Sequence, residues 1–286
     1  MPSTREIRGR IRSVQNTAKV TRAMEMIAAS KMRRAQQRLL DSRPYSKAML
    51  NVMGNLASQT AGVDEPHPLM MKREVRNVQI VLVTPDRGLC GGLNANLNRF
   101  FLQFVRDQSA NISVVAVGKR GRDFSTRSRL NIKADYIEIG DTPSAGDIAD
   151  VPKTVIKGYE SGEVDEVYIC YSQFISTTVQ KPAMVKILPV EPVELDGSAN
   201  LDYIYEPKAV SVLQALVPKF VEMQIFQGIL ESIGSEQSAR MVAMSSATDS
   251  ANEMIQDLTL LMNKVRQASI TTELLDIVGG VAALEG

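Results

Sequence analysis

The amino-acid sequence predicts a mixed α+β fold. Helices from the two ends of the chain form a long antiparallel coiled coil, and the middle forms a Rossmann-like α/β domain with a mostly parallel five-stranded sheet. Apolar residues recur at heptad spacing near both ends, and β-rich runs alternate with helical stretches between them. Aromatic residues make up only 5% of the chain, which suits helix seams of aliphatic side chains. We expect an N-terminal helix over 1–60, the α/β domain over 75–206 and a C-terminal helix over 207–286.

The first helix has a start signal and a heptad pattern. Ser3 is a suitable N-cap, and Glu6 stands at the capping-box position three residues later. The apolar stripe begins at Ile7, Ile11, Val14 and Ala18, slips to Val20, Met24 and Ile27, and resumes at Ala28, Met32, Ala35 and Leu39. A stripe that slips stays close to the straight 3.6-residue helix, so we expect little supercoiling.

The last helix carries the strongest structural signal in the sequence. Pro218 is expected to break or kink its beginning. From Met244 on, spacings of three and four alternate for more than five heptads, which is typical of a coiled-coil seam. The predicted seam consists of Met244, Ala247, Ala251, Met254, Leu258, Leu261, Val265, Ala268, Thr272, Leu275, Gly279 and Ala282.

The middle of the chain alternates between strand and helix. Strands are expected over 78–84, 112–118, 134–140, 164–172 and 183–191, and helices over 93–106, 119–128 and 143–161. Alternation of this kind predicts parallel pairing with helices on both faces of the sheet. Too few residues join the last two strands for a crossover, so these two are expected to form an antiparallel hairpin.

The charge is divided unevenly along the chain. The whole carries a net +1, yet residues 1–47 contain 12 Lys and Arg against 3 Asp and Glu. Such a split indicates that one segment faces an acidic partner. No run of about 18 apolar residues is present, so we expect no membrane span. The charged N-terminus does not resemble a signal peptide, and the cysteines Cys90 and Cys170 are expected to be reduced thiols in a cytosolic compartment.

The sequence offers little for catalysis, and we expect no catalytic residues, no cofactor and no metal. His67 is the only histidine, and no set of residues has metal-ligand spacing. The turn at 86–94, DRGLCGGLN, fits neither a dinucleotide fingerprint nor a P-loop. We interpret it as a tight turn in which Gly91 and Gly92 let a helix pack on the sheet, with Cys90 in an exposed position.

Two other classes of protein fit parts of the sequence. One is a nucleotide-binding α/β enzyme with a helical arm, which would need a phosphate loop. The other is an RNA-binding protein with a basic coiled-coil arm. No aromatic residue precedes Tyr45, so the basic segment lacks the rings that stack on bases.

Four stretches resemble the γ subunit family of F-type ATP synthases: residues 7–36, the turn at 86–94, and residues 235–255 and 263–280. The resemblance covers the whole chain and implies a rotor of the central stalk, not catalytic on its own. One copy would couple proton or sodium translocation to ATP synthesis or hydrolysis. It would contact the α3β3 hexamer, the ε subunit and the c-ring, and no nucleic acid. It would lie at the cytoplasmic face of a bacterial cell membrane as a peripheral subunit.

The resemblance also implies contact residues. Those for torque and the β subunit are Met24, Arg240, Arg266, Gln267, Thr271 and Glu273; those for the c-ring or ε are Tyr203, Tyr205 and Glu206. The segment 275–284 is expected to run on beyond the first helix, alone, in an apolar sleeve of the hexamer. The connection 191–207 is short, so the redox-regulatory insertion of chloroplast-type subunits is not expected.

Overall fold

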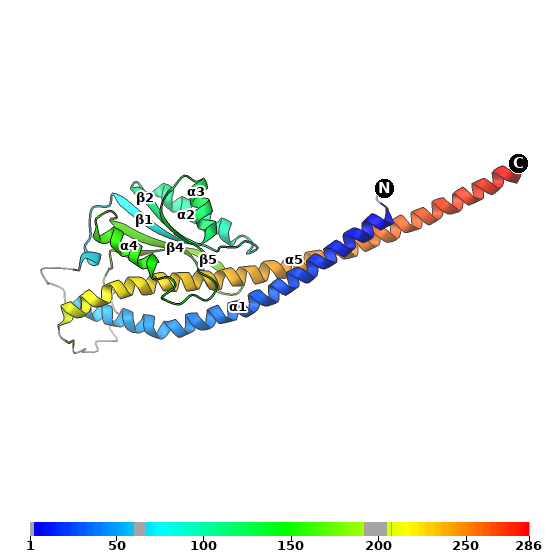
Figure 1. Ribbon diagram of the computed structural model, residues 1–286. Helices are drawn as coiled ribbons and strands as arrows, with labels where there is room; N and C mark the ends of the chain where they lie inside the picture. The colour runs from blue at the N-terminus through cyan, green and yellow to red at the C-terminus, as the bar shows by residue number, and fades with distance from the viewer. Residues whose placement is uncertain (1–2, 60–66, 192–204, 207, 286) are drawn as a thin grey trace. The chain divides into compact units, whose positions relative to one another are not determined.

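A computed structural model describes residues 3–59, 67–191, 205–206 and 208–285 (Figure 1). Two compact units can be distinguished. The helix-pair unit comprises residues 1–28 and 241–286, and the sheet unit comprises residues 29–240. Helix α1 (Thr4–Gln59) and helix α5 (Ala209–Glu285) contribute residues to both units.

The N-terminus of α1 has the predicted capping box. The Glu6 N–H donates to Ser3 Oγ at 3.3 Å, and the Ser3 N–H donates to Glu6 Oε2 at 2.9 Å. These two bonds satisfy donors that have no partner within the first turn of the helix.

In the helix-pair unit, α1 and α5 run antiparallel along a regular seam (Figure 1). The seam also contains polar residues. The hydroxyls of Thr21 in α1 and Thr248 in α5 lie 2.7 Å apart and form a hydrogen bond between the two helices. The inward residues of α1 alternate by four and three without a slip: Ile7, Ile11, Val14, Ala18, Thr21, Glu25 and Ala28. Those of α5 do the same: Met244, Thr248, Ala251, Ile255, Leu258, Met262 and Val265.

The predicted seams were therefore wrong in part. In α1 the slip does not occur, and Val20, Met24 and Ile27 point outward with 54%, 37% and 56% of their surface exposed. In α5 every other predicted residue was misplaced by one position, and the side chains from Ala268 to Val281 are all exposed. Each helix has apolar residues beside its seam as well as in it. The prediction therefore assigned some residues from the exposed edge of the apolar face to the seam. The α5 residues affected are Ala247, Met254 and Leu261.

The sheet unit contains the predicted five-stranded sheet, with strand order β3-β2-β1-β4-β5. Strands β1 (Asn77–Val83), β2 (Asn111–Val117), β3 (Asn131–Tyr136) and β4 (Glu166–Phe174) are parallel, and β5 (Gln180–Leu188) pairs antiparallel with β4, as expected. The helices between them are α2 (Leu93–Asp107), α3 (Lys119–Arg127) and α4 (Asp150–Glu160), and a short 3-10 turn, η1 (Pro68–Met70), precedes β1.

Several predicted boundaries differ from the structure. Helix α4 begins seven residues later than expected, because Asp147 Oδ2 accepts hydrogen bonds from the N–H and the hydroxyl of Ser144 and holds a turn there. Strands β3 and β5 begin three residues earlier than expected. Pro218 does not end α5: the neighbouring Val217, Phe220 and Val221 are buried in the core, and their packing outweighs the missing backbone hydrogen bond.

Helices cover both faces of the sheet (Figure 1). On one face, Leu97 and Phe101 of α2 and Phe124 of α3 pack against β1 and β2. On the other face, α4, α5 and part of α1 bury a larger apolar cluster. Among the described residues, one helix, α5, is apolar enough over Ala209–Val281 to cross a membrane by length and composition, a test that core helices of soluble proteins also pass. The expected absence of a span stays a prediction.

Candidate interaction surfaces

The turn after β1 is held by its own carboxylate. Asp86 follows β1, and its Oδ1 accepts the Lys119 N–H at 2.8 Å while its Oδ2 accepts the Glu138 N–H at 3.1 Å. Lys119 begins α3, so Asp86 takes the place at a helix N-terminus where a nucleotide-binding protein holds a phosphate. The turn thus ties together the ends of β1, β2 and β3 and leaves these two amides occupied.

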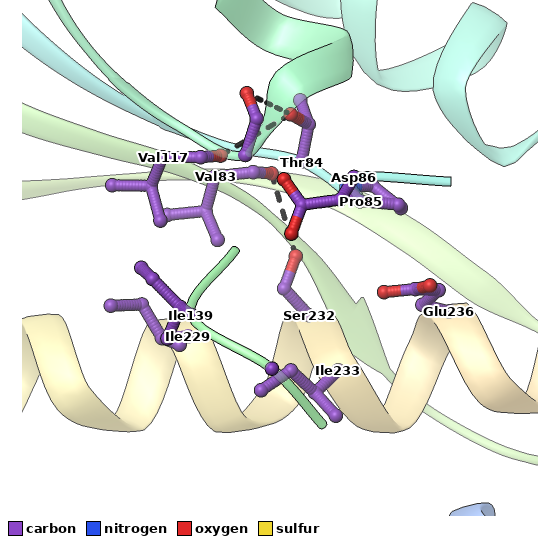
Figure 2. Close-up of a pocket in the computed structure, with 12 residues that line it drawn as sticks. Val83, Thr84, Pro85, Asp86, Val117, Ile139, Ile229, Ser232, Ile233 and Glu236 are labelled. Carbon is purple, nitrogen blue, oxygen red and sulfur yellow. Dashed lines mark hydrogen bonds between the residues drawn. The ribbon is translucent and has the colours of Figure 1, made fainter. Parts of the chain in front are cut away.

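A small cavity lies at the carboxyl ends of these strands. Its volume is about 40 Å³, and Figure 2 shows Thr84, Asp86, Ser232 and Glu236 around it. This volume suits one or two water molecules and is far below the roughly 300 Å³ at which pockets for small molecules begin. A nucleotide does not fit here.

A larger cavity of about 500 Å³ lies next to it. Its lining has four acidic residues and three basic ones: Asp86, Glu138, Asp141, Glu236, Arg87, Lys119 and Arg122. An excess of carboxylates opposes the binding of a polyphosphate. The geometry therefore does not favour the nucleotide-binding alternative.

Arg240 turns its guanidinium inward within the sheet unit. Its Nη2 donates to the Gly88 carbonyl at 3.2 Å and to Glu236 Oε1 at 2.6 Å, and only 14% of the side chain is exposed. Burial raises the pKa of the Glu236 carboxyl, and nearby Arg240 opposes this rise. Arg240 thus supports the turn after β1.

Both cysteines are buried free thiols, so the exposed position expected for Cys90 was wrong. Asn94 Nδ2 donates to Cys90 Sγ at 3.3 Å, and burial raises the pKa of this thiol. Burial raises the pKa of Cys170 to about 12. Gly91 has φ 57° and Leu89 has φ 63°, so the turn is tight, as expected. Within the described ranges no group of three potential metal ligands occurs.

His67 caps a short turn. Its Nδ1 accepts the Leu69 N–H at 3.1 Å at the start of η1, and burial lowers the pKa of the imidazole. This contact gives the single histidine a structural role.

The residues expected at the β subunit lie mostly on the helix-pair unit. Arg266, Gln267, Thr271 and Glu273 are exposed, on the part of α5 that follows the last seam residue. The Thr271 hydroxyl donates to the Gln267 carbonyl at 2.9 Å, so it is partly used within the helix. Met24 is exposed on α1.

The residues expected at the c-ring or ε lie in the sheet unit. Tyr205 is half-buried against the larger apolar cluster, and Glu206 is exposed. Tyr203 lies outside the described residues.

Comparison with known proteins shows which family the chain belongs to. The family model described as ATP synthase matches residues 3–284. An ATP synthase gamma chain from Dehalococcoides mccartyi (strain CBDB1) is 52% identical over 284 residues, covering 99% of this chain and 100% of the relative. The chain belongs to the ATP synthase gamma chain family. Another gamma chain, from Roseiflexus castenholzii, is 50% identical over 287 residues and covers 99% of each chain.

Solved structures share the fold of this gamma chain family member. A chain of the Euglena gracilis mitochondrial ATP synthase in rotational state 3 aligns with a TM-score of 0.69 and 18% identity, covering 98% of this chain and 94% of that chain. A chain from the central stalk and c-ring of the Tetrahymena thermophila mitochondrial ATP synthase gives a TM-score of 0.60 at 21% identity, covering 80% and 99%. At identities of 18% and 21%, these matches show a shared fold and nothing more.

Sequence reasoning missed the residues that join α1 and α5 to the sheet and to the loop after β3. Asp141 accepts hydrogen bonds from Lys31 Nζ of α1 at 2.5 Å and from Gln237 Nε2 of α5 at 2.8 Å. Buried serines of α5 make further bonds to the strands. A signal was present: small and polar residues interrupt the apolar pattern of α5 at SIGSEQS, residues 232–238.

Proposed function

We propose that this chain is the rotor of an ATP synthase central stalk. It turns within the α3β3 hexamer and transmits torque between the membrane c-ring and the catalytic β subunits. This couples proton or sodium movement to ATP synthesis or hydrolysis. The chain itself is non-catalytic in this proposal, one copy serves each complex, and the complex lies at the cytoplasmic face of a bacterial membrane.

The observation that carries the proposal is the exposed end of α5. From Arg266 to Val281 every side chain is exposed, and among them Ile270, Leu274, Leu275, Ile277, Val278 and Val281 are large and apolar. An isolated helix with so much exposed apolar surface is unusual in a chain that acts alone. A surrounding apolar sleeve in the hexamer would cover it, and small residues such as Gly279 and Gly280 would leave few fixed contacts.

The surface of the helix-pair unit suits a rotor because its sides differ. Exposed basic residues cover much of α1: Arg5, Arg8, Arg10, Arg12, Lys19 and Arg22. Val20, Met24 and Ile27 form an apolar strip on the same helix. Three equivalent sites around such a body each meet a different face at any moment. Differential contact of this kind is what allows an element to change the affinity of a site.

Specific contacts complete the proposed mechanism. Arg266 and Gln267 offer several hydrogen-bond donors to one loop of a β subunit. Met24, Arg240, Thr271 and Glu273 are proposed as weaker contacts on the same shaft. In the sheet unit, Tyr203, Tyr205 and Glu206 are proposed to contact the c-ring or ε.

The test is purification of the complex through a tag on this chain, with identification of the subunits and measurement of ATP hydrolysis. Replacing both Arg266 and Gln267 by alanine should lower turnover roughly tenfold, the scale of an interface hot spot. The matched control is Lys264→Ala, an exposed cation half a turn away on α5. Equal turnover in the double alanine variant and in the Lys264→Ala control would contradict the proposed contact. A tagged chain that captures no α or β subunit would contradict the rotor assignment.

A further inference from the structure

Strand β4 continues beyond the point where β1 stops pairing with it. The last β1–β4 partners are Leu82 and Cys170, yet β4 runs on to Phe174. Ser172 is therefore left without β1 beside it, although it is buried. The N–H and C=O of Ser172 both point to the β1 side, so β5, where Pro182 stands opposite, does not supply their partners. The buried backbone of Ser172 needs hydrogen-bond partners from outside the sheet.

Serines of α5 supply those partners. The Ser172 N–H donates to Ser232 Oγ at 3.5 Å. The Ser232 hydroxyl donates in turn to the Val83 carbonyl of β1 at 3.4 Å, as Figure 2 shows. The Ser235 hydroxyl donates to the Ser172 carbonyl at 2.8 Å. Two helix side chains thus continue the hydrogen-bond ladder where the strand has ended.

A third serine reaches the hairpin between β4 and β5. The Ser238 hydroxyl donates to the Thr177 carbonyl at 2.6 Å, and Gln180 Nε2 donates to Ser238 Oγ at 3.4 Å. Ser232, Ser235 and Ser238 are spaced by three residues, so they lie along one face of the helix. All three are buried, so water does not replace these bonds.

Close packing holds the helix at this distance from the sheet. A Cβ at Gly228 would lie 2.6 Å from Ile169 Cδ1, so a larger residue there would displace either the buried Ile169 side chain or α5 itself. The hydroxyls of Ser235 and Ser238 reach the backbone carbonyls because the helix axis lies so near the strands. Small residues on this face are therefore a requirement of the contact.

We propose that Ser232, Ser235 and Ser238 form a torsional lock, the serine lock, between α5 and the sheet. The hydrophobic effect itself is non-directional, so close packing alone fixes the rotation and the sliding of a helix less specifically than directional bonds do. Hydrogen bonds to fixed carbonyls are directional and resist both motions. The lock rests on the proposed rotor function: it keeps α5 from slipping against the α/β domain while torque passes between them.

The experiment uses the complete ATP synthase in membrane vesicles, with Ser235→Ala and Ser238→Ala combined. ATP hydrolysis and ATP-driven ion pumping are measured together against ion gradients of increasing size. We expect the ratio of ions pumped to ATP hydrolysed to equal that of the wild type without a gradient. At the steepest gradient that the wild type sustains it should fall about twofold or more, because two directional bonds no longer oppose slippage. Ser211→Ala, an exposed serine on α5, is the matched control.

The outcomes separate the alternatives. A wild-type ratio at every gradient would overturn the lock, even if the variant unfolds at a lower temperature, because that result shows a purely structural role. If the double variant does not assemble, Ser238→Ala alone serves, since the Thr177 carbonyl keeps the Gln180 Nε2 donor at 3.1 Å. Ion pumping by a complex that lacks this chain would contradict the rotor function itself, a result distinct from failure of the lock.

Discussion

Asp86 shows how one side chain can remove a ligand site from an α/β fold. The carboxyl ends of parallel strands form the usual place for a bound phosphate. Here the carboxylate of Asp86 accepts the N–H groups of Lys119 and Glu138. An internal carboxylate keeps three loops in one arrangement without a nucleotide, which suits a part that must stay rigid while other subunits turn ATP over.

The two cysteines should resist alkylation in the folded chain. Burial raises the pKa of Cys170 to about 12, and it also raises the pKa of Cys90. Since the thiolate is the reactive form, labelling by iodoacetamide at pH 8 should be at least roughly a hundredfold slower in the native chain than in urea. Mass spectrometry after timed quenching measures both rates. Rapid native labelling of either thiol would show that its site opens readily.

At the scale of elements, the sequence predicted correctly that two helices pair in the helix-pair unit. It predicted only some of the residues that lie in the seam between them. Heptad spacing identified both helices, and the capping box at Ser3 located the start of α1. The phase was missed because Thr21, Glu25 and Thr248 occupy seam positions while apolar Val20, Met24 and Met254 lie at the edge. A hydrophobicity pattern cannot distinguish residues in a seam within the chain from an exposed apolar strip that would contact another subunit.

Two methionines of α5 test the phase of the seam directly. Met244 is 5% exposed within the seam and Met254 is 52% exposed at its edge. Met244→Ala should lower the free energy of unfolding by about 2–5 kcal/mol, because it leaves a cavity between the helices. Met254→Ala should change it by less than about 0.5 kcal/mol. Urea denaturation followed by circular dichroism measures both, and equal losses would contradict the seam described here.

The sheet was predicted more completely than its attachment to α5. Alternating strands and helices determine a parallel sheet, and a short connection determines the final hairpin. The serines at 232, 235 and 238 interrupt the apolar pattern of α5, but that interruption does not say which groups their hydroxyls bind. Only the place where β1 ends, which depends on tertiary structure, shows why those hydroxyls are buried.

At the scale of the whole molecule, the exposed end of α5 can be removed without disturbing any described buried side chain. Deletion of residues 277–286 should therefore leave the stability of the chain within about 0.5 kcal/mol of the wild type. The shortened chain should assemble and keep part of its rotation, since Arg266 and Gln267 remain. Co-purification and turnover of the complex measure this outcome. Complete loss of assembly would count against the apolar sleeve.

The family assignment and the helix–sheet–helix order were both predictable from sequence, whereas the contact residues were not settled by it. Arg240 stays a proposed shaft contact, and in this chain its Nη2 already donates to Glu236 and to the Gly88 carbonyl, which the motif did not indicate. A motif preserves residue identity, and only the fold shows which way the side chain turns.

The central claim is that this chain turns as a unit inside its complex. Its most direct test fixes the α3β3 hexamer to a surface and follows a probe attached to the sheet unit of this chain while ATP is hydrolysed. The account predicts rotation in one direction with three pauses per turn, one for each catalytic site. Sustained ATP hydrolysis by intact complexes whose probe stays still would contradict it.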